Sequence, residues 1–247
     1  MASEVSPSSN GLPAEIVDGM RMIREDFTRF LLGYQFAMQE ITTKLEILRD
    51  EFAELHSDNP IEHISTRLKS PESIVAKAKR QDVGLTTAAI GEHVTDIAGI
   101  RVVCPFVADV ERLVEALTNQ PDITVRTLKD YIRNPKPNGY RSLHAILEVP
   151  VYLSSGPVRV PVEVQFRTVA MDFWASTEHK IFYKYEGDVP PDLRRRITEA
   201  AATAAQLDEE MAELYRTVHG RPAGAADGQY PVTPPISDDV LRRLTED

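Results

Sequence analysis

Alternation between apolar and polar side chains, with a period of two residues, is the feature that most constrains the fold of this 247-residue chain. It is clearest at 161–167, where apolar residues alternate with Glu163, Gln165 and Arg167. Successive side chains of an extended strand point to opposite faces, so these three polar side chains share one face and the apolar side chains share the other. We therefore expect a strand with one buried face and one polar face.

Three further segments show the same division, with strands predicted near 64–69, near 97–104 and from 143 onward. Apolar residues fill one face of each segment, and the opposite faces carry Arg67, Lys69, Arg101, Ser142 and His144. A solvated outer face is sufficient to explain one such strand on its own. Four strands with charged or hydrogen-bonding side chains on one face instead indicate a polar cleft over a sheet.

The order of the elements predicts an α/β (α+β) fold, with a mixed sheet of about five strands flanked by helices. Apolar residues at helical spacing and turn residues predict helices over 16–56, 71–80, 107–117, 169–185 and 193–219, with a short one near 238–244. Strands are predicted over 64–69, 97–104, 123–129, 143–153 and 158–167. No glycine-rich turn joins a strand to a helix, which argues against a Rossmann fold.

The chain is long enough, and with 42% hydrophobic residues apolar enough, for one domain with a core. We expect a single domain over 15–219, a disordered tail over 1–14 and a mostly disordered tail over 220–247. No stretch approaches the ~20 apolar residues that cross a bilayer, and the N-terminus lacks the charge pattern of a signal peptide. The single cysteine, Cys104, cannot form an internal disulfide, which fits a reducing cytoplasm.

Positive charge is concentrated in two segments of a chain whose net charge is −10. Residues 67–80 contain five basic residues and one acid, and residues 126–141 again contain five against Asp130 alone. In the first segment, Ser73, Lys77 and Arg80 are spaced to share one face of a helix. A chance cluster on a solvated face is the alternative, but two such islands favour a local polyanion ligand such as the phosphates of a nucleotide.

Two acids approach this basic region from separate predicted strands. Asp96 precedes the strand at 97–104, and Glu163 lies in the last strand. A carboxylate pair can hold Mg²⁺ between phosphate oxygens, and one carboxylate can also accept a hydroxyl proton. Tyr140 follows Gly139 in a loop, so its ring can be presented to a nucleobase. The chain has no Walker motif, and its histidines lack zinc-ligand spacing.

Taken together, these segments resemble the synthetase domain of the RelA/SpoT homologue family, and the short length is similar to that of its stand-alone small alarmone synthetases. The matching segments are 67–74, 96–101, 130–132, 135–144 and 162–168, continuing to Trp174, Glu178–Lys180 and Tyr183–Lys184. The family fold resembles polymerase-β-type nucleotidyltransferases, but their Asp-x-Asp pair is absent at Asp96 because position 98 is Ala. The chain also has no His-Asp dipeptide, so the hydrolase activity of bifunctional relatives is not expected.

The resemblance implies a Mg²⁺-dependent GTP pyrophosphokinase of the stringent response, which transfers pyrophosphate from ATP to the 3′-hydroxyl of GTP or GDP and releases AMP. Asp96 and Glu163 would be the catalytic, metal-binding carboxylates. The residues implied for ATP are Arg67, Lys69, Ser73, Lys77, Arg80 and Arg101, with the first and last stacking on adenine. The residues implied for GTP or GDP are Lys136, Asn138, Tyr140, His144 and Gln165, with Tyr140 stacking on guanine.

Asp172 is a separate inference from the residues themselves. A carboxylate at the start of the helix after Glu163 can accept hydrogen bonds from guanine N1–H and the exocyclic amine. An acid at a helix N-terminus can equally serve to stabilise the helix dipole. Both interpretations stay open.

Two other functions are compatible with the same residues. One is a pyrophosphotransferase acting on an adenine nucleotide or a tRNA, and the other is a catalytically inactive nucleotide sensor. The presence of both Asp96 and Glu163 argues against the sensor. The family resemblance further implies a homotetramer without a membrane partner, with RNA only as a regulator. The roles of Glu178 and His179 and the preferred acceptor stay undecided.

Overall fold

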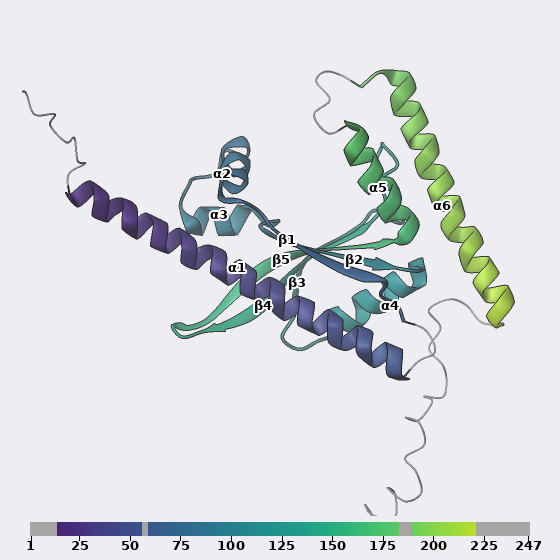
Figure 1. Ribbon diagram of the computed structural model, residues 1–247, viewed down its shortest axis with the longest axis horizontal. Coiled ribbons are helices and arrows are strands. Elements are labelled where there is room, and N and C mark those ends of the chain that lie inside the picture. Colours follow the sequence, from purple (N-terminus) through teal and green to yellow (C-terminus); the bar gives the residue numbers. More distant parts are fainter. Residues whose placement is uncertain (1–13, 56–58, 183–188, 221–247) are drawn as a thin grey trace, which may run out of the picture.

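The computed structural model describes residues 14–55, 59–182 and 189–220, which form a five-stranded mixed sheet between helices (Figure 1). The strand order is β1-β2-β5-β4-β3, with β2 and β5 parallel and every other neighbouring pair antiparallel. The strands are β1 His63–Leu68, β2 Ala98–Cys104, β3 Thr124–Asp130, β4 Leu143–Leu153 and β5 Gly156–Thr168. The helices are α1 Ala14–Leu55, α2 Pro71–Arg80, α3 Thr87–His93, α4 Val107–Thr118, α5 Val169–Phe182 and α6 Pro191–His219.

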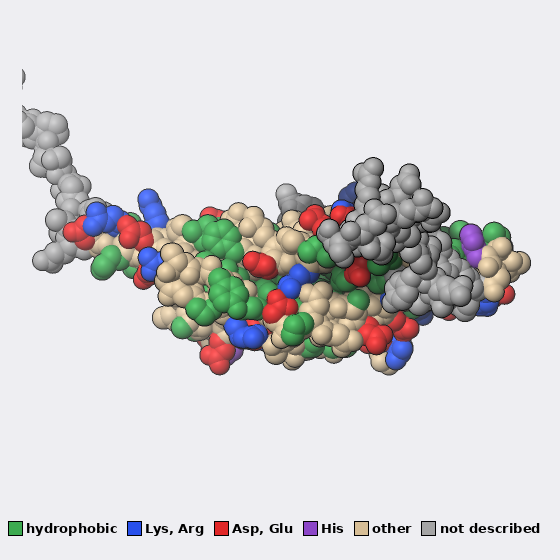
Figure 2. Space-filling model, turned by 90° about the horizontal axis from the view of Figure 1, so that it is seen from below, with side chains coloured by type: hydrophobic (Ala, Val, Ile, Leu, Met, Phe, Trp, Pro, Cys, Tyr) green, Lys and Arg blue, Asp and Glu red, His purple; other side chains and the backbone are tan. Residues whose placement is uncertain are grey.

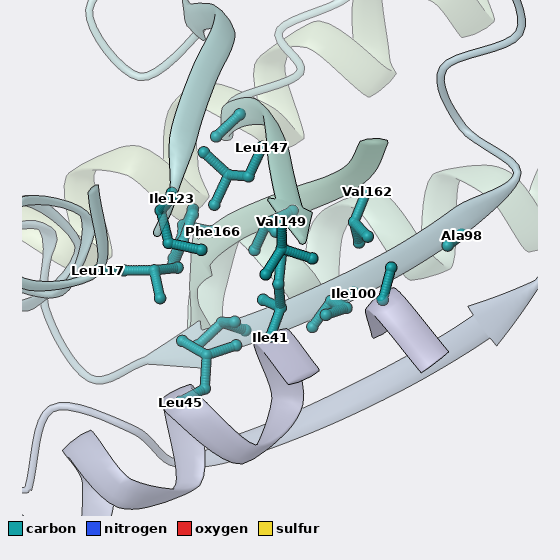
Figure 3. Close-up of a cluster of buried hydrophobic side chains, with 14 of the residues drawn as sticks. Ile41, Leu45, Ala98, Ile100, Leu117, Ile123, Leu147, Val149, Val162 and Phe166 are labelled. Carbon is teal, nitrogen blue, oxygen red and sulfur yellow. The ribbon is translucent and has the colours of Figure 1, made fainter. Parts of the chain in front are cut away.

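The hydrophobic core lies between one face of the sheet and the helices α1 and α4 (Figure 3). Val162 and Phe166 of β5 are almost completely buried there, as the alternation in this strand predicts. Helix α1 contributes Ile41 and Leu45, which are four residues apart and therefore on one helical face. The predicted α/β architecture with a mixed five-stranded sheet is confirmed.

Helix α2 begins and ends at the predicted residues because its local signals are strong. Ser70 caps it by accepting a hydrogen bond from the amide of Ser73 at 3.3 Å, and Pro71 occupies the first helical position. Helix α3 is absent from the sequence prediction. It has seven residues with only Ile90 buried, so no apolar period marks it, although Thr86 caps it through the amide of Ala89.

Helix α6 packs against α5 on the opposite side of the sheet from α1 (Figure 1). Trp174 of α5 donates a hydrogen bond to the carbonyl of Ile197 at 3.1 Å. The loop before β4 also contacts α6, at Gly139, whose φ is +87°. A Cβ at this glycine would lie 2.4 Å from the Cβ of Ala201, so only a residue without a side chain allows this approach.

Several predictions fall outside the described residues. These are the two tails, the short helix near 238–244, the end of the helix predicted over 169–185, and the family segment Tyr183–Lys184. Within the described ranges, no helix has the length and apolar character needed to cross a membrane.

Candidate active site

A cavity of about 810 Å³ opens on the polar face of the sheet, beside α5. Its volume is within the range of small-molecule sites. It is lined by residues from β1, β2, β5, α5 and the loop before β4, which are far apart in the sequence. The lining includes the predicted site residues Arg67, Lys69, Asp96, Arg101, Tyr140, Glu163 and Gln165.

The strand pairing explains why these side chains meet. Ser65 of β1 pairs with Arg101 of β2, which pairs with Gln165 of β5, which pairs with His144 of β4. Residues paired across neighbouring strands point to the same face, so the four side chains form one row. A second row joins Arg67 to Glu163 across Gly99, which contributes no side chain between them. The polar face predicted from the alternation is thus present on four strands, and three of them, β1, β2 and β5, line the cavity.

Two lysines neutralise Asp96. The Nζ of Lys69 lies 2.7 Å from Oδ2, and the Nζ of Lys77 lies 2.7 Å from Oδ1. Lys69 follows β1 and Lys77 lies on α2, so separate elements deliver the two charges. Burial by itself raises the pKa of Asp96, but hydrogen bonds from the two lysines outweigh it and hold the pKa below its ordinary value.

Glu163 is held by two side chains from the neighbouring row. Gln165 donates from Nε2 to Oε2 at 2.9 Å, and Nδ1 of His144 lies 3.5 Å from Oε1. Burial alone raises the pKa of Glu163, but these contacts and the charge interaction with His144 lower it overall. The Nε2 of His144 in turn lies 2.7 Å from the hydroxyl of Tyr140, so the histidine connects the carboxylate to the aromatic ring.

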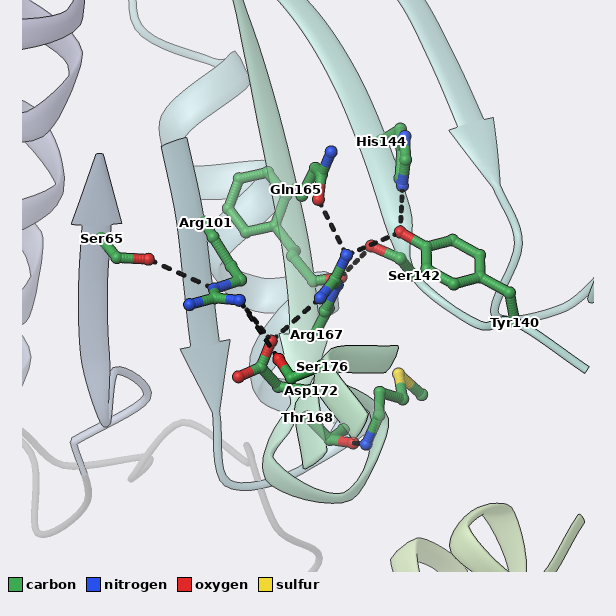
Figure 4. A network of polar contacts seen from close by, with 12 residues as sticks. Ser65, Arg101, Tyr140, Ser142, His144, Gln165, Arg167, Thr168, Asp172 and Ser176 are labelled. Carbon is green, nitrogen blue, oxygen red and sulfur yellow. Dashed lines mark hydrogen bonds and ion pairs between the residues drawn. The ribbon is translucent and has the colours of Figure 1, made fainter. Parts of the chain in front are cut away.

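Arg167 is central to a network of polar contacts at one end of the cleft (Figure 4). Its guanidinium donates to Oδ1 of Asp172, to the hydroxyl of Tyr140 and to Oε1 of Gln165, each at 2.9 Å. Arg101 reaches the same oxygen of Asp172 at 3.2 Å. The carboxylate of Asp172 therefore lies between two guanidinium groups, in the first turn of α5.

The predicted acceptor residues of the loop before β4 also gather. The Nζ of Lys136 lies 4.7 Å from the ring centre of Tyr131 and 4.9 Å from that of Tyr140, in cation–π geometry. Asn138 accepts from the amide of Tyr140 and donates to Glu178 of α5 at 3.3 Å. These contacts orient the loop toward α5.

Several predicted residues do not line the cavity itself, namely the ATP ligands Ser73, Lys77 and Arg80, the acceptor residues Lys136, Asn138, His144 and Asp172, and the strand residue Ser142. Ser73 is occupied with Ser70 at the start of α2, and Arg80 is exposed at the end of that helix. The shared helical face therefore brings Lys77 to Asp96 without bringing its two companions. Ser142 is completely buried and donates to the backbone carbonyl of Phe166.

Several cavity residues have no role in the sequence prediction. Arg167 is placed on the polar face by the alternation, but the sequence provides no sign that it contacts three other side chains. Ser65 and Ser176 both accept hydrogen bonds from Arg101, at 3.2 and 3.4 Å. Sequence spacing could have identified both serines. Ser65 lies two residues before Arg67 and so on the same face of the strand, and Ser176 lies four residues after Asp172 and so on the same face of α5.

Comparison with known proteins agrees with this geometry. The family described as "Region found in RelA / SpoT proteins" matches residues 66–188. The chain is 46% identical to GTP pyrophosphokinase YwaC of Bacillus subtilis over 202 residues, which is 82% of this chain and 96% of the relative. It is 39% identical to GTP pyrophosphokinase YjbM of the same organism over 190 residues, covering 77% of this chain and 89% of the relative.

Solved structures give the same result. A crystal structure of small alarmone synthetase 2 from B. subtilis superposes with a TM-score of 0.71 at 45% identity, over 78% of this chain and 99% of that one. Small alarmone synthetase 1 from B. subtilis, bound to its product pppGpp, also has a TM-score of 0.71, at 38% identity over 78% and 97% of the two chains. This extent of similarity in sequence and fold shows that the chain belongs to the RelA/SpoT family.

Proposed function

We propose that the chain is a GTP pyrophosphokinase that transfers the β,γ-pyrophosphate of ATP to the 3′-hydroxyl of GTP or GDP. The observation that carries this proposal is a single cavity in which two carboxylates, Asp96 and Glu163, lie between a cationic side and a Tyr/His/Gln side. The relatives at 46% and 39% identity are GTP pyrophosphokinases, which supports the same reaction. The products are pppGpp or ppGpp and AMP, and no hydrolase activity is expected.

The cationic side is proposed to bind ATP. Arg67 and Arg101 have planar guanidinium groups suited to stacking on adenine. Lys69 and Lys77 would transfer their hydrogen bonds from Asp96 to the phosphates, and Ser73 and Arg80 of α2 would contact the outer phosphates. The crystal structure of small alarmone synthetase 1 bound to AMPCPP supports an ATP site in this fold.

The opposite side is proposed to bind the acceptor nucleotide. Tyr140 would stack on guanine, while the side chains of the same loop and row, Lys136, Asn138, His144 and Gln165, position its ribose and phosphates. Asp172 would accept from the guanine edge through Oδ2, since both arginines contact Oδ1. The hydroxyl contact between Tyr140 and His144 supports a preformed acceptor side.

In the reaction, the acceptor 3′-oxygen attacks the β-phosphorus of ATP, a new O–P bond forms, and the bond between the β-phosphorus and the oxygen bridging to the α-phosphate breaks. That oxygen leaves with AMP. Glu163 is the proposed base for the hydroxyl proton, because its lowered pKa keeps it ionised at neutral pH. Positioning and charge neutralisation are expected to provide most of the rate enhancement.

Asp96 and Glu163 fit a Mg²⁺ site by their chemistry. Hard carboxylate oxygens suit this ion, which usually binds one or two carboxylates together with phosphate oxygens and water. Among the described residues, no three His, Cys, Asp or Glu side chains gather as a metal site, so the remaining ligands would come from the nucleotide and water. When bound, the ion would neutralise charge on the pyrophosphate.

We also propose that 15–219 forms a single synthetase domain that assembles as a homotetramer in the cytoplasm, with RNA only as a regulator. Exposed apolar side chains support assembly. On α6 they follow a helical stripe formed by Leu207, Met211, Leu214 and Val218. On α1 they include Met20, Met22 and Ile23. Figure 2 shows that hydrophobic side chains also lie exposed among charged ones on one face of the molecule.

The test is transfer of label from ATP carrying radioactive β-phosphate, with Mg²⁺ and either GTP, GDP, ADP or tRNA. Labelled pppGpp or ppGpp is expected with the wild-type chain and not with Glu163→Gln. Glu148→Gln is the matched control, because Glu148 lies on the same sheet but pairs with Arg126 outside the cavity. Transfer only to ADP or tRNA would overturn the assignment of GTP or GDP as the acceptor. ATP binding without any transfer would overturn the enzymatic function and favour the catalytically inactive nucleotide sensor.

A further inference from the structure

Two arginines share one oxygen of Asp172, and they differ in their access to the cavity. Arg167 and Asp172 have side chains that are only 10% and 15% exposed, whereas Arg101 is 37% exposed. Arg101 is therefore the member of this group that a ligand can reach most easily. A ligand that draws its guanidinium away from Oδ1 leaves Arg167 as the remaining donor to that oxygen.

The other end of the Arg167 guanidinium leads to the opposite side of the cavity. The nitrogen that does not contact Asp172 donates to both Tyr140 and Gln165 at 2.9 Å. The Nε of Arg167 is buried and has no hydrogen-bond partner among the described residues. Because the guanidinium is a rigid plane, a change in its contact with Asp172 alters its contacts with Tyr140 and Gln165.

The backbone beneath these side chains cannot accommodate such a change. Arg101 lies opposite Gln165, and Val103 lies opposite Arg167, in the parallel pair β2 and β5 at the centre of the sheet. Two other strands flank this pair, so hydrogen bonds fix both backbones. The adjustment must therefore be made by the side chains of Arg101, Asp172 and Arg167.

We propose that the Asp172–Arg167 ion pair is a positioning relay that couples the two nucleotide subsites. It rests on the proposed function, which assigns Arg101 to ATP and Tyr140 and Gln165 to the acceptor. Stacking of ATP on Arg101 strengthens the remaining contact between Asp172 and Arg167, and this fixes Tyr140 and Gln165 in the arrangement that receives guanine. By linkage, the acceptor nucleotide strengthens ATP binding by the same factor.

The experiment measures the dissociation constant of AMPCPP with Mg²⁺ by calorimetry, with and without saturating GDP, on the full chain. GDP is expected to tighten AMPCPP binding ~5-fold or more in the wild-type chain, as is typical of coupled sites. In Arg167→Met the effect of GDP is expected to vanish, with little change in the affinity for AMPCPP alone. Arg167→Lys is expected to retain part of the effect of GDP. An ammonium group can keep the ion pair with Asp172 but lacks the planar guanidinium that also donates to Tyr140 and Gln165.

Two further variants separate coupling from folding. Arg159→Met is the matched control, since Arg159 lies on the same strand but is exposed and contacts Thr124. Arg167→Met combined with Asp172→Leu removes the buried pair as a unit, which avoids leaving one charge unpaired. Thermal unfolding of each variant shows whether it is folded. The affinity of each variant for GDP is measured separately, because Asp172 is also proposed to contact guanine, and the double variant is expected to bind AMPCPP without coupling at a GDP concentration that saturates it.

The two proposals fail in different ways. Coupling of wild-type size in Arg167→Met or in the double variant, or no effect of GDP on the wild-type chain, would overturn the relay. Absence of pyrophosphate transfer by the wild-type chain would instead overturn the proposed reaction, because binding is measured without turnover. In turnover at saturating ATP, the relay also requires the KM for GDP to rise more in Arg167→Met than kcat falls.

Discussion

Gly139 and Ala201 approach so closely that a Cβ on the glycine would lie 2.4 Å from the Cβ of the alanine. This contact holds the loop before β4 against α6, and Tyr140 is the next residue of that loop. The position of the ring proposed to stack on guanine therefore depends on Ala201 of α6, a helix that is distant from Tyr140 in the sequence.

Gly139→Ala is expected to destabilise the protein by about 1–3 kcal/mol, because it combines overpacking with a strained backbone. Activity should fall by more than the loss of folded protein explains, since Tyr140 moves with the loop. Gly156→Ala is the control, because Gly156 also has a positive φ, of +114°, but has no atom within 4 Å of an added Cβ. Thermal unfolding and the transfer assay measure the two effects. Full activity in Gly139→Ala would contradict this interpretation. Adding Ala201→Gly to the Gly139→Ala chain should restore part of the lost activity, because it removes the Cβ that the new alanine would meet.

Lys77→Ala is expected to lower kcat/KM for ATP on the order of 10²-fold, which is typical when one charge-stabilising donor is removed. The reason is that Lys77, whose Nζ lies 2.7 Å from Oδ1 of Asp96, is one of the two lysines proposed to exchange their contact with Asp96 for a contact with the ATP phosphates. Lys79→Ala is the matched control, because Lys79 is an exposed lysine of the same helix. Equal losses in the two variants would mean that α2 contributes only general positive charge.

Asp208 of α6 is expected to make stability depend on pH. Burial raises the pKa of this carboxyl above its ordinary 3.8, although Thr168 donates a hydrogen bond to it at 2.7 Å. A folded-state pKa above the unfolded one means that the native state binds more protons in this window. The contribution is therefore complete below pH 3.8 and is lost as pH rises through the higher folded-state value.

Asp208→Asn removes this titration and keeps an acceptor for Thr168. Its melting temperature relative to the wild-type chain should therefore increase from pH 3.8 upward and then level off above the folded-state pKa of Asp208. Asp96 and Glu163 titrate in both chains, so the difference isolates Asp208. If the difference in melting temperature between Asp208→Asn and the wild-type chain did not change with pH, Asp208 would not be a source of the pH dependence of stability.

Mg²⁺ is expected to bind the nucleotide-free chain weakly and the ATP complex more strongly. In the nucleotide-free chain the ion must displace Lys69 and Lys77 from Asp96, both at 2.7 Å. Phosphates provide these lysines with new partners and supply further oxygen ligands for the ion. Titration of Mg²⁺ with and without AMPCPP measures the difference, and Asp96→Asn should abolish it. Equal affinity in the two states would contradict the role of the lysines.

Much of the fold follows from local sequence signals. The alternation in β5 separates Val162 from Glu163 correctly, and the Ser-Pro pair that begins α2 marks its first residue. The short α3 lacks such a signal, since one buried side chain makes no period. The site residues from several strands are also recognisable, because each strand shows its own polar face and the family motifs cover them.

The order of strands in the sheet and the partners of individual side chains do not follow from local patterns. Nothing near Arg167 indicates that its guanidinium reaches Asp172, Tyr140 and Gln165 together, since these contacts depend on rotamers and on the placement of β5 between β2 and β4. Likewise, Ser73, Lys77 and Arg80 lie on one helix as predicted, but their spacing alone does not indicate that only Lys77 pairs with Asp96.

The two lysines on Asp96 have a consequence for the order of events in the cavity. Together their ammonium groups carry the same charge as one divalent cation, so the carboxylate has a complete counter-ion before any ligand arrives. If ATP binds with Mg²⁺ as proposed, the lysines would pass from Asp96 to phosphate oxygens, and the carboxylate of Asp96 would become available to hold the ion. In the nucleotide-free chain the two ammonium groups exceed the single negative charge of Asp96 by one, and this excess favours the arrival of a polyanion.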